Sequence, residues 1–133
     1  MSNPVLDRKL AKLKVFVEDL RAYAQLDEPS RLREHYAIER LLQLLCEAAA
    51  DIALQVVKAH KLPVGGSYRE IFSVLAAKDI LPAELANELA LACGMRNILP
   101  HLYDEIDLGQ VVRAVEPAVA LYETFAQWAL HQP

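Results

Sequence analysis

The residues best suited to chemistry stand close together in the stretch CGMRNILPHLY, residues 93–103. Within it are Arg96, Asn97, His101 and Tyr103. A histidine has an unperturbed pKa of ~6.5, so it can accept or donate a proton near neutral pH. An arginine presents a planar fork of N–H donors that can brace developing negative charge. These residue types suggest proton transfer beside an anion.

The spacing of these residues predicts how a helix would aim them. Arg96 and Tyr103 are seven positions apart, which is a difference of about 20° on a straight helix, so they share a face. His101 is five positions from Arg96, about 140° around the same helix. Pro100 removes the hydrogen bond to the Arg96 carbonyl and crowds it, so we expect a kink or a break that could turn the imidazole toward the guanidinium.

Each of these residues also has an ordinary structural interpretation. Arg96 could form an ion pair, for example with Asp104. His101 could cap a helix or lie on the surface, and Tyr103 could lie at the edge of the core. Pro100 could simply end the helix. An arginine on an apolar helical stripe is nevertheless unusual, because arginine is almost never buried unpaired. This part of the stripe should therefore face a polar cavity or a partner.

Apolar residues recur at steps of three and four along most of the chain, which is typical of amphipathic helices. No segment alternates as a half-buried strand would. Ser67 and Glu70 form a Ser-x-x-Glu capping box, and Pro117 should interrupt and bend the last helix. We expect a single domain, residues 1–133, that is an all-α up-and-down four-helix bundle with one extra short helix. The expected helices cover about 5–26, 30–59, 67–78, 82–103 and 107–129.

Composition narrows the function classes. The chain of 133 residues has a net charge of −4, and residues 79–133 contain only two arginines against eight acidic residues. It is therefore no general nucleic-acid coat, and any such contact must be local. Cys46 and Cys93 are interpreted as reduced core thiols, with a structural disulfide as the lesser alternative. The spacing of histidines and cysteines predicts no metal site. With no leader or spanning segment in the pattern, we expect a cytoplasmic protein.

The spacing Arg-x-x-x-x-His-x-Tyr, with Asn97 directly after the arginine, resembles the signature of HEPN-domain proteins and of their HepT-like toxin branch. The flanking segments 37–53, 67–97 and 101–111 are similar to that family as well. The resemblance covers roughly residues 5–130. The chain departs from the family pattern at Pro100 and Leu102, where an aliphatic and often an acidic residue are expected.

This resemblance implies a homodimeric HEPN-like fold and a metal-independent endoribonuclease that needs no cofactor and is the toxin of a toxin–antitoxin pair. Arg96 and His101 would be catalytic, facing the same motif of a second subunit, and Asn97 would orient the phosphate. The antitoxin would be a minimal nucleotidyltransferase that transfers AMP to Tyr103. RNA is the expected substrate, and neither DNA nor a membrane is an expected partner.

Two other function classes stay open on the sequence alone. One is a non-catalytic helical dimer that only binds a nucleotidyltransferase partner or a nucleotide. The other is a structural adaptor in which Arg96 does no more than form an ion pair.

Overall fold

The computed structural model describes the backbone of residues 3–98 and 108–132, and the side chains of the same ranges except 95–98. Every regular element in these ranges is a helix, as the periodicity predicts. Four helices are long and three are short. They are α1 (Pro4–Ala24), α2 (Glu28–Arg33), α3 (His35–Ala59), α4 (Tyr68–Ala77), α5 (Ala83–Ile98), α6 (Leu108–Arg113) and α7 (Val115–Leu130).

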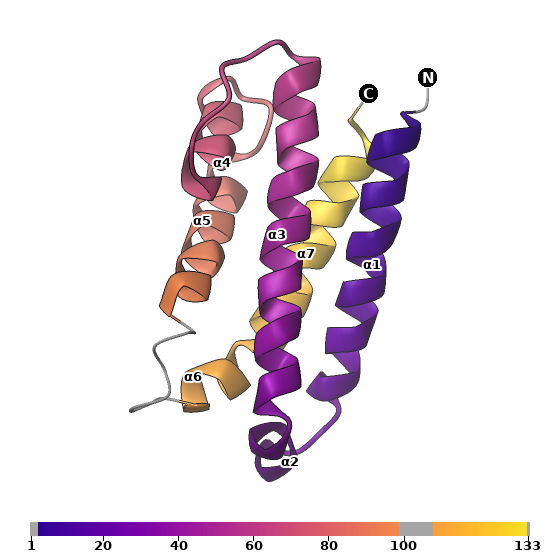
Figure 1. The fold of residues 1–133 in the computed structure, drawn as a ribbon, viewed down its shortest axis with the longest axis vertical. Coiled ribbons are helices and arrows are strands. Elements are labelled where there is room, and N and C mark those ends of the chain that lie inside the picture. Colours follow the sequence, from indigo (N-terminus) through magenta and orange to yellow (C-terminus); the bar gives the residue numbers. More distant parts are fainter. Residues whose placement is uncertain (1–2, 99–107, 133) are drawn as a thin grey trace.

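The four long helices run alternately up and down, which confirms the predicted bundle (Figure 1). α3 lies at the centre, with α1 and α7 on one side and α4 and α5 on the other. α6 sits below the lower end of α5, near the short α2. In the described part of the chain, no helix is long and apolar enough to span a membrane.

The core forms where the predicted stripes meet. In α1 the buried residues follow steps of three and four, and α7 is anchored to α4 through Phe125, whose ring meets Phe72 edge to face at 6.5 Å. Trp128 adds a polar anchor, because its Nε1–H donates to the Ile80 carbonyl at 2.9 Å. This bond fastens the connection between α4 and α5 to α7. The buried stripe of α1 consists of Leu6, Leu10, Leu13, Val17 and Leu20.

Two of the expected helical segments are divided, the first against the expectation of one continuous helix and the second as predicted. The segment 30–59 breaks at Glu34, which separates α2 from α3. The last helix breaks at Ala114, three positions before Pro117. The proline ring clashes with the carbonyl four residues back, at Arg113, so an interruption belongs just before Pro117 in the chain. The expectation of one extra short helix was therefore too low for the described residues, whereas the predicted interruption near Pro117 is confirmed.

Arg31 connects three separate elements through backbone carbonyls. Its guanidinium donates to the carbonyls of Ala24 at 2.8 Å, Leu26 at 3.1 Å and Val112 at 3.2 Å. It also forms an ion pair with Glu116 of α7. Ala24 and Val112 lie in the last turns of α1 and α6, where helix carbonyls have no N–H of their own helix to accept from. Arg31 thereby fixes α6 against the end of α1.

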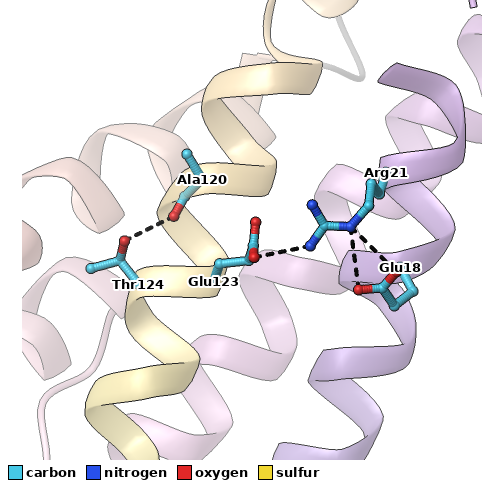
Figure 2. Close-up of polar contacts among 5 residues, drawn as sticks. All are labelled: Glu18, Arg21, Ala120, Glu123 and Thr124. Atoms are coloured by element: carbon cyan, nitrogen blue, oxygen red, sulfur yellow. Dashed lines mark hydrogen bonds and ion pairs between the residues drawn. The ribbon is translucent and has the colours of Figure 1, made fainter. Parts of the chain in front are cut away.

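A second arginine joins the terminal helices at the surface. Arg21 of α1 contacts Glu18 one turn earlier and reaches Glu123 of α7 at 3.0 Å (Figure 2). The hydrogen bond to Glu123 is the main reason that the pKa of Arg21 is raised above its ordinary value. On α7 itself, the Thr124 hydroxyl donates back to the Ala120 carbonyl at 3.0 Å (Figure 2). The pairing of α1 with α7 thus has a polar rim as well as an apolar core.

The expectation of two reduced thiols is wrong in this structure. Cys46 of α3 and Cys93 of α5 are both buried, as predicted, but they form a disulfide. Their Cα atoms are 5.5 Å apart, well inside the range that a disulfide can bridge. A sequence separation of 47 gave no sign that the two helices would bring the sulfurs together.

Candidate functional site

The predicted site residues lie at and beyond the end of α5. Arg96 and Asn97 belong to the last turn of this helix, which continues to Ile98. His101 and Tyr103 lie outside the described residues, as does Pro100, so the expected kink and the pairing of Arg96 with His101 stay predictions. The structure therefore places the helix that carries Arg96 and the helix, α6, that follows Tyr103 in the chain.

Packing and a covalent link hold α5 in position. Leu85 and Leu89 face the core, as their stripe predicts, and Ala92 is only half-buried. Instead of Ala92, the neighbouring Cys93 is buried, and its sulfur is joined to Cys46 of α3. The link stands three residues before Arg96, so the last turn of α5 starts from a fixed point on the central helix.

The start of α4, alongside α5, is set by the predicted capping box. The Ser67 hydroxyl accepts from the Glu70 N–H at 3.2 Å, and the Glu70 carboxylate accepts from the Gly66 N–H at 3.0 Å. Gly65 has to be a glycine here, because a Cβ at this position would lie 2.5 Å from the Glu70 Cβ. The loop is therefore folded tightly onto the first turn of α4, to which Arg69 belongs.

Two adjoining hollows lie beside α5 on the side of α4 and α6. The first, of about 560 Å³, is bordered by α4, α5 and α6, and the second, of about 410 Å³, continues toward the loop at Gly65. They share Arg69, Ala90 and Gly94. We call the first hollow the α5 groove. Its principal lining residues are Arg69, Ala90, Leu91, Gly94, Gln110 and Arg113.

The described lining of the α5 groove carries positive charge only. Arg69 and Arg113 line it, and none of its described lining residues is acidic. This is unexpected in a chain of net charge −4. Sequence reasoning singled out Arg96 and missed both of these arginines as site residues. The available signal was that Arg113 is the one other basic residue after Lys78; only the fold brings Arg69 beside it.

The described residues contain no group of three or more His, Cys, Asp or Glu side chains placed to hold a metal ion. What they offer at the end of α5 is a hollow with two guanidinium groups, bordered by the helix that carries Arg96 and Asn97. Such an arrangement suits a ligand with several negative charges, because arginine pairs with phosphate through two parallel hydrogen bonds.

Comparison with known proteins gives a consistent result. The family model "Ribonuclease HepT-like" matches residues 6–128. The chain is 33% identical to a tRNA nuclease HepT of Aphanizomenon flos-aquae over 92% of this chain and 86% of that protein. It is 28% identical to an mRNA nuclease HepT of Shewanella oneidensis over 92% of this chain and 94% of that protein.

Solved structures agree with these relatives. The tri-AMPylated HEPN toxin of Shewanella oneidensis, solved in complex with its MNT antitoxin, superposes with a TM-score of 0.82. The identity is 26%, and the match covers 96% of this chain and 97% of that one. The family model covers most of all four long helices and the whole segment from Arg96 to Tyr103. The chain belongs to the HepT-like ribonuclease family.

Proposed function

We propose that this protein is a metal-independent endoribonuclease and the toxin of a toxin–antitoxin pair, with Arg96 and His101 as its catalytic residues. One observation carries the proposal: the HepT-like ribonuclease model matches residues 6–128, which include the complete Arg-x-x-x-x-His-x-Tyr segment. The two HepT relatives are a tRNA nuclease and an mRNA nuclease. RNA is therefore the substrate class, while the kind of RNA differs between relatives.

The proposed reaction uses the substrate's own 2′-hydroxyl as nucleophile. His101 removes the proton from this hydroxyl, and the 2′-oxygen forms a bond to phosphorus. The bond from phosphorus to the 5′-oxygen breaks, and that oxygen takes a proton from the partner subunit's His101. Arg96 braces the extra charge on the phosphorane, and Asn97 orients the phosphate. The products are a 2′,3′-cyclic phosphate and a 5′-hydroxyl.

A homodimer supplies the second motif that this reaction needs. Arg96 falls on the helical row of Leu85 and Leu89, seven positions after Leu89, and residues at that spacing share a face of a helix. An arginine on a row that faces the core is reasonable where the row continues into an interface with a second subunit. Two copies of the motif would then face each other across one cleft.

The proposed control is AMP transfer to Tyr103 by a nucleotidyltransferase antitoxin. The tyrosine oxygen forms a bond to the α-phosphorus of ATP, and pyrophosphate leaves. The added group is bulky and negatively charged, so it blocks the cleft and repels RNA phosphates. The Shewanella relative, which was solved AMPylated and bound to an MNT antitoxin, supports this assignment.

Cleavage of RNA by the purified protein in EDTA tests the catalytic assignment. Arg96→Ala and His101→Ala should each abolish cleavage. His60→Ala is the matched control, because His60 lies exposed at the end of α3, and it should cleave as the parent does. Full activity of His101→Ala would refute the mechanism, and loss of activity in EDTA would refute metal independence.

A second experiment separates the toxin from a non-catalytic binding module. The protein is co-expressed with a small nucleotidyltransferase of the MNT type, and its intact mass is measured. The proposal expects added AMP groups that disappear in Tyr103→Phe. A non-catalytic module would bind the nucleotidyltransferase but would neither arrest growth when expressed alone nor cut RNA.

A further inference from the structure

We propose that the α5 groove is a binding track for the RNA backbone, in which Arg69 and Arg113 hold phosphates of the strand that leads to the cleavage site. The inference rests on the proposed ribonuclease function and adds to it two RNA-contacting residues outside the Arg-x-x-x-x-His-x-Tyr motif.

Position is the first argument. The groove is bordered by α5 and α6, the two helices that the proposed catalytic segment connects. Positions 90, 94 and 97 of α5 follow each other at steps of four and three, so they form one row along the helix. Ala90 and Gly94 of this row line the groove, and the next member is position 97, the proposed phosphate-orienting asparagine. A strand lying in the groove is therefore led along α5 to the motif.

Charge is the second argument. Arg69 stands exposed in the first turn of α4, and none of the ion pairs formed by described residues involves it. Arg113 is exposed at the end of α6. The acidic C-terminal part of the chain, residues 79–133, contains no lysine and only two arginines, Arg96 and Arg113. Arg96 is in the motif, and Arg113 lines the groove. Two guanidinium groups, with no acidic residue among the described lining, favour a polyanion over an acidic or apolar side chain.

Gly94 is the third argument. A glycine inside a helix costs free energy relative to alanine, so it needs a reason. Packing against the described residues supplies none here, because a Cβ at Gly94 would have no described atom within 4 Å. The residue is exposed on the floor of the groove, beside Ala90. Close approach of a ligand to the backbone is a reason for glycine at such a place.

The test measures RNA binding at several salt concentrations in the full-length His101→Ala protein, which binds without cutting. Each lost phosphate contact to a single strand lowers the slope of log K against log salt by about 0.7. Arg69→Gln/Arg113→Gln should therefore lower it by about 1.4 and weaken binding roughly tenfold near 0.15 M salt. Arg8→Gln/Arg40→Gln is the control: it makes the same change in net charge with exposed arginines of α1 and α3 that do not line the groove.

A steric variant tests the same surface without a change in charge. Gly94→Leu should weaken RNA binding at least fivefold while the melting temperature and the dimer stay as in the parent, and Gly94→Ala should have a smaller effect. The proposal is overturned if the double arginine variant keeps the parental salt slope or matches the control. It is also overturned if Gly94→Leu impairs only dimerisation or only binding of the nucleotidyltransferase, while its affinity for RNA is unchanged.

These outcomes are distinct from a failure of the proposed function. If the parent protein cuts no RNA, the catalytic assignment fails, while the binding measurement in His101→Ala still decides whether the groove holds RNA. If the parent cuts RNA and the arginine variants bind and cut as the parent does, the groove proposal alone fails.

Discussion

Replacing Arg31 by methionine should destabilise the protein strongly, although the residue lies near the surface in a short helix. The side chain is only 12% exposed and makes three hydrogen bonds to carbonyls of Ala24, Leu26 and Val112. A hydrogen bond from a charged donor contributes about 1.5–3 kcal/mol, and neighbouring bonds are not additive. We expect Arg31→Met to lower the free energy of unfolding by about 3 kcal/mol. Methionine keeps an unbranched apolar chain, so the change reports mainly on the lost donors.

The matched control is Arg33→Met. Arg33 belongs to the same short helix and carries the same charge, but it is exposed, and its hydrogen bond to a described residue goes to the Ser30 hydroxyl. Chemical denaturation at fixed protein concentration should place this variant within about 0.5 kcal/mol of the parent. A loss of ~3 kcal/mol in Arg31→Met corresponds to a fall in melting temperature of roughly 10 °C.

The ion pair to Glu116 is separated from the hydrogen bonds by a third variant. Glu116 is largely exposed, so Glu116→Gln should cost less than about 1 kcal/mol. The reasoning is refuted if Arg31→Met is no less stable than Arg33→Met, or if Glu116→Gln alone reproduces the whole loss. In the first case the three carbonyls are satisfied equally well without Arg31.

Three further predictions concern the link, the helix ends and pH. Intact mass and thiol labelling in denaturant without reductant should find no free thiol, and two free thiols would contradict the structure. In Cys46→Ala/Cys93→Ala the free energy of unfolding should fall by up to about 4 kcal/mol, the chain-entropy value for a loop of 47 residues. Asp79, just after α4, has a φ of 56°, a left-handed angle that glycine adopts without the steric cost of a Cβ. Asp79→Gly should therefore raise the stability by up to about 1 kcal/mol in thermal melts. A loss of stability would show that the Asp79 side chain matters more than its backbone angle. A hydrogen bond from Ser30 lowers the pKa of the Asp27 carboxyl below 3.8. The ionised cap therefore stabilises the fold above that pH, and its contribution is lost as the pH falls through the lowered pKa. The difference in melting temperature between Asp27→Ala and the parent should be present at pH 7 and vanish near pH 2.

The periodicity of apolar residues was sufficient to predict the bundle. The stripe of α1 and most inward positions of α7, such as Val119 and Tyr122, are buried as expected. Local chemistry was also readable, since Ser67 caps α4 and Pro117 marks an interruption of the last helix. These features depend on neighbours within one or two turns, and the sequence contains all of those neighbours.

Features that depend on distant parts of the chain were missed. Glu34 breaks a helix without a glycine or a proline, at the end of the short helix that Arg31 holds against carbonyls of α1 and α6. The disulfide between Cys46 and Cys93, and the placing of Arg69 and Arg113 around one groove, likewise need three-dimensional proximity. The predicted motif lies largely outside the described residues, so its geometry stays a prediction.

The contact between the first and last helices bears on how the protein is made. α7 packs along α1 and carries Phe125, which meets Phe72 of α4 in the core. A nascent chain that still lacks α7 leaves these apolar surfaces uncovered, so the bundle closes only after the last helix has left the ribosome. Cleavage activity should therefore begin only after α7 has been synthesised and has packed against α1.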